Sequence, residues 1–292
     1  MSIAETWTVK RLLEWTTDFF KKKGIDMPRL DAEILLSAAM KVKRIELYTN
    51  FETEPNESHR TLFRELVKRH AMGEPVAYLV GFKEFYSIPL KVDPNVLIPR
   101  PETELLVLET LDILKTFSAD SYPVVCDVGT GSGAIAIAVA KNLPAPVKQT
   151  TTIVAIDNSL EVFSIAKLNA LSNEVADRIE FCCSDLLAEV TETFDVIVGN
   201  LPYISQSEYE ILPKEVKNFE PQQALLAGRN GTEIIERLTT QLPQKLKPNG
   251  SVLLECSPMI AESVAAFFAD WNNVQIIKDN AGHQRLVSAT RN

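Results

Sequence analysis

The tetrapeptide Asn200-Leu201-Pro202-Tyr203 contains the residue types needed to hold a planar amino group in one orientation. The lone pair of an amide or aromatic NH2 is drawn into the π system, so a reaction at this nitrogen depends mainly on aiming it. The Asn200 side-chain oxygen and the Leu201 backbone carbonyl can accept its two N–H groups, because Pro202 restricts the direction of that carbonyl. Tyr203 offers a flat face to the same group. The pattern predicts chemistry at such a nitrogen, although Asn and Pro are also common in simple turns.

A glycine-rich segment earlier in the chain has the pattern of a ligand-binding turn. The apolar run Val124–Val128 is typical of a buried strand, and the apolar stretch Ala134–Ala140 is typical of a packed helix. Between them lie Gly129, Thr130, Gly131, Ser132 and Gly133. Glycines adopt turn conformations and leave no Cβ in the path of a ligand. With Asp127, the segment resembles the D-x-G-x-G-x-G loop of S-adenosylmethionine (SAM) methyltransferases, and the alternative is a turn that only packs a helix against a sheet.

Acidic residues follow the next two predicted strands. Asp157 ends the apolar run Ile153–Ile156, and a carboxylate at this place can accept both hydroxyls of a ribose. Asp185 follows the strand predicted over Ile179–Cys183. Its carboxylate can accept an adenine amino group, with Leu186 against the ring, or it can cap a helix. Both interpretations of Asp185 stay open at this point.

The elements that must position these residues begin at Val124. From there, predicted strands alternate with helices, which indicates a Rossmann-like α/β domain with a mainly parallel seven-stranded sheet and helices on both faces. The carboxyl ends of parallel strands share one edge, where ligands bind. Gly129, Asp157, Asp185 and Asn200 each follow a predicted strand end. We therefore expect them to form one site.

The segment before this sheet has a different character. Residues 8–72 repeat apolar residues at helical spacing, which predicts a small all-helical domain over residues 1–74. Alternating apolar residues from Val76 onward predict a β-hairpin linker over residues 75–100. The remaining residues, 101–292, make up the predicted α/β domain. The helical part carries no motif that could do chemistry.

Composition excludes several classes of protein. The 292 residues, with 46% hydrophobic and 24% charged, are ordinary for two globular domains. No apolar run approaches the ~20 residues that span a bilayer, and the N-terminus lacks an apolar signal core, so we expect no export. Three histidines and four cysteines without a C-x-x-C pair predict reduced thiols and no metal site. The net charge of −9 argues against nucleic-acid binding through counterion release.

Nearly the whole chain resembles the HemK-type protein-glutamine methyltransferases. Beyond the glycine loop and Asn200–Tyr203, the similarity rests on Glu84-Phe85-Tyr86, on the LIPRPETE string Leu97–Glu104, on Phe219-Glu220-Pro221, and on Asp279–Gly282 with Arg285. The IPRPETE string is specific to this group, whereas most SAM methyltransferases share the glycine loop. The resemblance implies methyl transfer from SAM to the side-chain amide nitrogen of glutamine in the Gly-Gly-Gln loop of class I peptide-chain release factors, with S-adenosylhomocysteine as the product.

The resemblance also implies roles for individual residues. The residues implied to contact SAM are Asp127, Gly129, Thr130, Gly131, Ser132, Gly133, Asp157, Asp185, Leu186 and Asn200. Asn200–Tyr203 are implied to hold the substrate glutamine, with Phe85 and Arg100 near it, while the helical domain and the hairpin help to grip the release factor. We expect a cytoplasmic monomer that binds no metal and contacts neither nucleic acid nor a membrane directly.

Three positions depart from the pattern of this family. Leu201 replaces the first proline of the usual N-P-P-Y, Ser87 replaces a glycine, and Glu255-Cys256-Ser257 replaces Glu-Ile-Gly. The form N-L-P-Y also resembles the rRNA adenine dimethyltransferases, so an RNA or DNA adenine-N6 methyltransferase with the same site is the alternative function. The charge of −9 and the N-terminal position of the helical domain argue against it. A SAM-binding module without turnover is a third possibility, but it should have a damaged tetrapeptide, and this one is intact.

Overall fold

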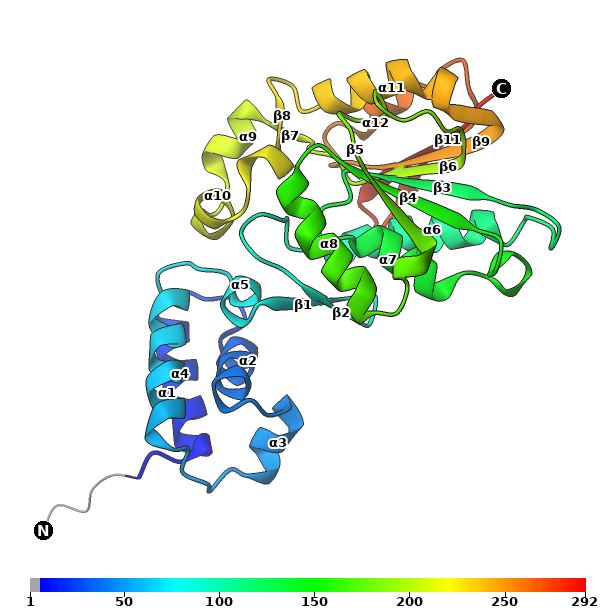
Figure 1. Ribbon diagram of the computed structural model, residues 1–292. Helices are drawn as coiled ribbons and strands as arrows, with labels where there is room; N and C mark the ends of the chain where they lie inside the picture. Colours follow the sequence, from blue (N-terminus) through cyan, green and yellow to red (C-terminus); the bar gives the residue numbers. More distant parts are fainter. Residues whose placement is uncertain (1–5) are drawn as a thin grey trace, which may run out of the picture. The chain divides into compact units, whose positions relative to one another are not determined.

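A computed structural model describes residues 6–292 of the chain. Its packing divides the chain into two compact units (Figure 1). The helical unit contains the residues up to Gly81 and the segment Lys214–Phe219, and the sheet unit contains Phe82–Pro213 and Glu220–Asn292. The hairpin that the sequence predicts as a separate linker therefore belongs to the sheet unit.

The helical unit packs its helices around one apolar core. Its elements are α1 (Val9–Lys22), α2 (Pro28–Met40), α3 (Arg44–Thr49), α4 (Glu57–His70), α5 (Val76–Val80) and α10 (Lys214–Phe219). The helical spacing of apolar residues on α1 puts Leu13 and Phe20 on one face, and both are fully buried. They share the core with Leu36 of α2 and Phe63 of α4. The all-helical character predicted for this part of the chain is confirmed.

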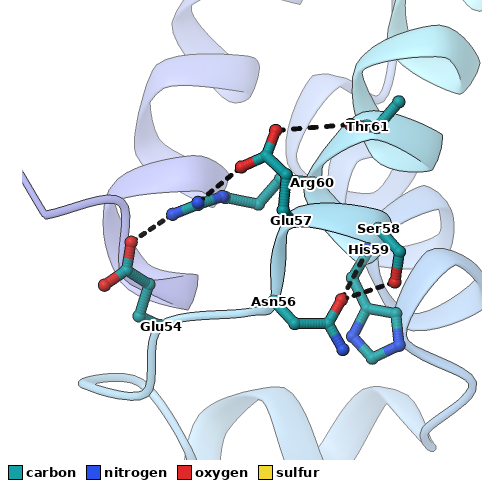
Figure 2. A network of polar contacts seen from close by, with 7 residues as sticks. All are labelled: Glu54, Asn56, Glu57, Ser58, His59, Arg60 and Thr61. Carbon is teal, nitrogen blue, oxygen red and sulfur yellow. Dashed lines mark hydrogen bonds and ion pairs between the residues drawn. The ribbon is translucent and has the colours of Figure 1, made fainter.

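Helix α4 begins with a network of polar contacts (Figure 2). The Asn56 side chain caps the helix, because its Oδ1 accepts a hydrogen bond from the backbone N–H of His59 at 2.8 Å. The Arg60 guanidinium donates to the Glu57 carboxylate at 2.6 Å and also contacts Glu54. The Asn56 contact satisfies one backbone donor of the first turn and so marks the point where the helix starts.

The other end of α4 carries a buried histidine. His70 Nε2 lies 3.1 Å from Asp31 Oδ2, and its Nδ1 lies 2.9 Å from the backbone oxygen of Glu74. Both neighbours are acceptors, so both ring nitrogens must carry a proton. Burial disfavours the charged ring, but the Asp31 carboxylate and the Glu74 carbonyl outweigh it and raise the pKa of His70. The imidazolium form, which the raised pKa favours, ties α4 to α2.

The extended structure predicted from Val76 is wrong for residues 76–80, which form helix α5. Val76, Leu79 and Val80 all pack against the helical core, and this i, i+3, i+4 spacing belongs to a helix. The alternation that suggests a strand runs over only five residues, too few to separate the two periods. Gly81, with φ of 77°, ends the helix in a left-handed conformation.

The sheet unit is built on a seven-stranded sheet with the order β10-β11-β9-β6-β3-β4-β5. Its strands are β3 (Val124–Val128), β4 (Thr152–Asp157), β5 (Ile179–Cys183), β6 (Phe194–Gly199), β9 (Leu246–Glu255), β10 (Asn272–Lys278) and β11 (Gln284–Thr290). The strands β3, β4, β5, β6 and β9 pair in parallel, whereas β11 is antiparallel to both of its neighbours. The mainly parallel Rossmann-like fold predicted from the sequence is confirmed.

Helices cover both faces of this sheet (Figure 1). One face is covered by α6 (Glu104–Leu114), α7 (Ala134–Asn142) and α8 (Leu160–Ser172), and the other by α11 (Glu233–Lys245) and α12 (Ala261–Ala266). Successive residues of β3 serve the two cores in turn, because Val125 packs under the first group of helices and Cys126 under the second. None of the helices within residues 6–292 has the length and apolar character needed to cross a bilayer.

A two-stranded hairpin, β1 (Phe82–Phe85) with β2 (Ile88–Lys91), is held firmly to the sheet unit. Its turn residues Tyr86 and Ser87 have φ of 51° and 59°, as a type I′ turn requires. The Asn169 side chain on α8 accepts from Lys91 N–H at 2.7 Å and donates to the Lys91 carbonyl at 3.0 Å. It also donates to the carbonyl of Ser132 at 2.9 Å. One buried side chain therefore joins the hairpin to the glycine loop.

Sequence reasoning predicts no element between β6 and α11, where the structure has several. The segment contains β7 (Ile204–Ser205), α9 (Gln206–Ile211) and β8 (Leu226–Gly228), and β7 pairs with β8 in parallel. Short turns of 3-10 helix complete the described elements: η1 (Pro101–Thr103), η2 (Ala145–Val147), η3 (Ala176–Arg178) and η4 (Gln222–Ala224). Of these, η1 ends at Thr103 and leads directly into α6.

Candidate active site

A pocket opens at the carboxyl ends of β3, β4, β5 and β6. The chain continues from β3 to β4 on one side and returns to β6 on the other, so the pocket lies at a topological switch point of the sheet. The residues of its wall include Asn95, Thr103, Gly129, Thr130, Gly131, Ser132, Asp157, Asp185, Leu186, Asn200, Leu201, Pro202 and Arg237. The structure thus brings together the four strand-end residues that the sequence analysis expects in one site.

The glycine loop forms one wall of this pocket in a conformation that needs glycine. Gly129, Gly131 and Gly133 have φ of 74°, 54° and 82°, where a side chain causes strain. A Cβ on Gly129 would lie 3.0 Å from Leu201 Cδ2, so the loop and the tetrapeptide pack directly against each other. Gly133 lies behind the wall, where a Cβ would meet Ile137 Cδ1 at 2.9 Å. Its role is packing of α7 against the loop.

Asp127 supports the loop from behind and is not part of the pocket wall. The residue is 1% exposed, and its Oδ2 accepts hydrogen bonds from the Thr130 hydroxyl at 2.8 Å and from Ala136 N–H at 3.1 Å. Burial raises the pKa of this carboxyl to about 6, against the effect of the two hydrogen bonds. The resemblance implies direct contact of Asp127 with SAM, whereas the structure gives it a supporting position.

Asp157 stands in the pocket wall at the end of β4. Its Oδ2 accepts from Gly131 N–H at 3.1 Å and its Oδ1 from Ser159 N–H at 3.2 Å. Burial raises the pKa of the carboxyl, and the backbone N–H groups act in the opposite direction. These bonds fix the direction of the carboxylate and leave it further lone pairs for a ligand in the pocket.

Asp185 also lies in the wall, but it caps no helix. Its carboxylate forms an ion pair with the guanidinium of Arg237 on α11, which lines the same pocket. Leu186 follows with φ of 56°, and its side chain is buried at the pocket. The helix cap that the sequence analysis leaves open is therefore wrong, while the contact with adenine stays a prediction.

The acceptor tetrapeptide begins directly after β6. Asn200 and Leu201 both line the pocket, and Leu201 is only 4% exposed because it packs onto the glycine loop. Asn200 Nδ2 donates to Thr103 Oγ1 at 2.9 Å. The amide nitrogen is thus occupied by a protein partner, and the amide oxygen stays available as an acceptor.

Tyr203 is set back from the wall that Pro202 forms. Its hydroxyl donates to Glu255 Oε1 at 3.3 Å, and burial together with the charge of Glu255 raises the pKa of the phenol. Glu255 is 3% exposed, and burial raises the pKa of its carboxyl to about 7. Arg285, held by Asp279 at 3.0 Å, opposes that shift.

Two residues implied to lie near the substrate are not in the pocket wall. Phe85 is 2% exposed and belongs to the apolar core with Ile88 and Leu106. Arg100 forms an ion pair with the buried Glu220. Both therefore have structural partners, and their contact with substrate stays a prediction.

The pocket residues that sequence reasoning misses include Thr103 and Arg237, and it also misses Glu255, a neighbour of Thr103. Thr103 and Arg237 line the wall, and Glu255 lies behind Thr103 and Tyr203. Thr103 and Glu255 stand inside strings that the sequence analysis quotes, but nothing in their spacing shows that they meet Asn200. Within residues 6–292, the structure has no group of His, Cys, Asp and Glu side chains arranged to hold a metal ion.

Two family models match separate parts of the chain. A model described as the PrmC N-terminal domain matches residues 11–81, and one described as the methyltransferase small domain matches residues 108–218. The 16S rRNA N2 G1207 methyltransferase of T. thermophilus, solved with AdoMet and guanosine, has a TM-score of 0.51 at 16% identity. It covers 72% of this chain and 50% of its own, and at this identity it supports the fold alone.

Full-length relatives decide the family. A release factor glutamine methyltransferase of Rhodopirellula baltica is 52% identical over 288 residues, which is 97% of this chain and 96% of the relative. The chain belongs to the release factor glutamine methyltransferase family. A second member, from Koribacter versatilis, is 36% identical and covers 96% of this chain and 97% of its own length. The resemblance to HemK-type enzymes is confirmed.

Proposed function

We propose that the chain transfers a methyl group from SAM to the side-chain amide nitrogen of the glutamine in the Gly-Gly-Gln loop of class I release factors. The proposal rests on the arrangement of Asn200 in the pocket wall. Its amide nitrogen donates a hydrogen bond to Thr103, which leaves its oxygen available as an acceptor. The names of full-length relatives support the same substrate. Release factors work on cytoplasmic ribosomes, so we place the activity in the cytoplasm.

The pocket fits SAM by its donor and acceptor groups. Asp157 presents a fixed carboxylate that can accept the two ribose hydroxyls, and the glycine loop offers backbone with no side chain in the way. Leu186 presents an apolar surface for the adenine ring, next to the ion pair of Asp185 and Arg237. SAM supplies a methyl group on a positively charged sulfur, which is already a good leaving group.

The main task of the protein is to orient the substrate amide nitrogen toward the methyl group. The Asn200 oxygen accepts one N–H of the substrate amide, and the Leu201 carbonyl accepts the other, with its direction limited by Pro202. The two acceptors hold the plane of the amide and favour electron density on the nitrogen as the C–N bond forms. The nitrogen loses its proton after the bond has formed, so no general base is needed first. The hydrogen bond from the Tyr203 hydroxyl to Glu255 holds the last residue of the tetrapeptide in place.

Transfer of labelled methyl groups tests the proposal. Purified enzyme and labelled SAM are incubated separately with a class I release factor, with its Gly-Gly-Gln variant carrying Gln→Ala, and with total rRNA. Label on the wild-type factor alone supports the proposal. Label on rRNA contradicts it and supports the adenine methyltransferase alternative, and absence of label with SAM still bound contradicts turnover on either substrate.

The variant Asn200→Ala separates catalysis from cofactor binding. Loss of one acceptor should lower kcat by about 10²-fold or more. The dissociation constant for SAM, measured by calorimetry, should change little. A variant with normal turnover rules out the two-acceptor mechanism.

A further inference from the structure

The side-chain amide of Asn200 can occupy its site in two orientations of nearly the same shape. Rotation by about 180° exchanges oxygen and NH2, and only the hydrogen-bond partners distinguish the two. A substrate amide that donates N–H requires the oxygen to face it. The partner on the far side must therefore select the orientation, and that partner is Thr103, 2.9 Å from Asn200 Nδ2.

A threonine hydroxyl alone cannot make this selection. It can accept from NH2, or it can donate its own hydrogen to the amide oxygen if the amide turns around. The selection becomes firm only when the hydroxyl hydrogen is used elsewhere. Thr103 is 4% exposed, so the partner that takes this hydrogen must be another protein group.

The sheet brings such a group to the same place. Strands β6 and β9 are parallel neighbours, and Gly199 pairs with Leu254. The next residue of each strand, Asn200 and Glu255, therefore emerges side by side at the carboxyl edge. Glu255 Oε1 accepts from the Tyr203 hydroxyl at 3.3 Å, whereas its Oε2 is buried and has no hydrogen-bond partner among the described residues. The hydroxyls of Thr103 and Tyr203 both favour the charged form of this carboxyl.

We propose that Thr103 and Glu255 act as a positioning relay that fixes the Asn200 oxygen toward the substrate nitrogen. Glu255, as a carboxylate, can only accept, so it accepts a hydrogen bond from the Thr103 hydroxyl. Thr103 is then left with only lone pairs, and it accepts from Asn200. This relay rests on the proposed function, because it gives a reason for the orientation that amide methylation requires.

The charge of Glu255 controls the relay. Burial and the Glu102 carboxylate disfavour the carboxylate, while the hydroxyls of Thr103 and Tyr203 and the Arg285 guanidinium favour it. Arg285 is in turn held by Asp279, and the neighbouring Cys256 thiol is kept neutral by burial and by Glu255. A protonated Glu255 can donate to Thr103, which can then donate to Asn200 and reverse its amide.

The test compares Thr103→Val with Thr103→Ser. The valine side chain has the shape of threonine without the hydroxyl, and serine restores the hydroxyl. Thr103→Val should lower kcat about tenfold or more, the factor expected for one orienting hydrogen bond, and Thr103→Ser should recover most of it. Thr110→Val is the matched control, because Thr110 is fully buried and donates only to the Leu106 carbonyl at 2.7 Å. Its kcat should equal that of the wild type.

A readout that needs no substrate keeps the relay separate from the proposed function. The two Nδ2 protons of Asn200 give a pair of NMR signals, assigned by their loss in Asn200→Asp. The pair should shift in Thr103→Val, return in Thr103→Ser, and move in wild type when the pH falls through the titration of Glu255. Glu255→Gln should abolish this pH response and also the matching acid limb of kcat.

Unchanged signals in Thr103→Val overturn the relay, and so does a normal kcat in that variant or failure of serine to restore it. If the wild-type enzyme does not label release factor at all, the proposed function fails while the NMR signals still decide the relay.

Discussion

Replacement of Gly133 by alanine should destabilise the sheet unit far more than the same change at Gly282. The two glycines have nearly the same backbone, with φ of 82° and 86°, so the strain of a side chain in this conformation is common to both. Their surroundings differ. A Cβ at Gly133 would meet Ile137 Cδ1 at 2.9 Å and Ala166 Cβ at 3.5 Å, whereas nothing lies within 4 Å at Gly282.

The magnitude follows from these two contributions. Left-handed backbone costs a non-glycine residue about 1–2 kcal/mol, and this cost applies to both variants. Overpacking of a tight interior adds about 1–3 kcal/mol, and it applies only at Gly133, because Ile137 is fully buried. With an m-value of about 2 kcal/mol/M, a difference of about 2 kcal/mol lowers the urea midpoint by about 1 M.

Tryptophan fluorescence can report this unit alone. Of the three tryptophans, Trp7 and Trp15 belong to the helical unit, whereas Trp271 packs on Phe268 in the sheet unit with ring centroids 5.2 Å apart. Both glycine variants are therefore made in a Trp7→Phe, Trp15→Phe background and unfolded in urea. Equal midpoints for the two variants would refute the reasoning, because they would show that Ile137 moves aside without cost.

Three further predictions concern the cofactor, the helical unit and the tetrapeptide. Asp157→Ala should weaken SAM binding in calorimetry by about tenfold or more, the factor for a charged acceptor, whereas Asp185→Ala should have a smaller effect, because its carboxylate already pairs with a guanidinium. The pKa of His70 is raised in the folded state, so its contact with Asp31 stabilises the helical unit fully below about pH 6.5. This stabilisation is lost as the pH rises through the raised pKa. The unfolding temperature should therefore fall with pH in this range in the wild type, and His70→Gln should lose that dependence. Leu201→Pro should retain activity, since the acceptor is the backbone carbonyl, and an inactive variant would indicate a loop adapted to another substrate.

The edge of the sheet that carries the site could be predicted because the pattern is local. An apolar run, a turn and a packed helix specify where a parallel strand ends, and Gly129, Asp157 and Asn200 follow such ends directly. The fold then brings the ends together without any information about pairs of residues. Elements with short or mixed patterns, such as α5, could not be predicted in the same way.

The support of the site could not be predicted, because it depends on contacts between distant parts of the chain. Thr103 lies 97 residues before Asn200, and no periodicity relates the two. Phe85 stands inside a family string, and its place in the apolar core depends on packing that no local pattern shows. Lys214–Phe219 packs with helices that precede it by more than a hundred residues, and this too leaves no local signal.

Because Asn169 binds both the hairpin and the glycine loop, we expect these two segments to open together in local unfolding. Its side chain holds both polar groups of Lys91 and the carbonyl of Ser132, and it is 1% exposed, so water cannot replace it without displacement of α8 or of the strand. Loss of these bonds removes one anchor of β2 and one anchor of the loop at the same moment. Amide hydrogens there should exchange with solvent as one cooperative group, and a ligand that slows exchange in the loop should slow it equally in β2.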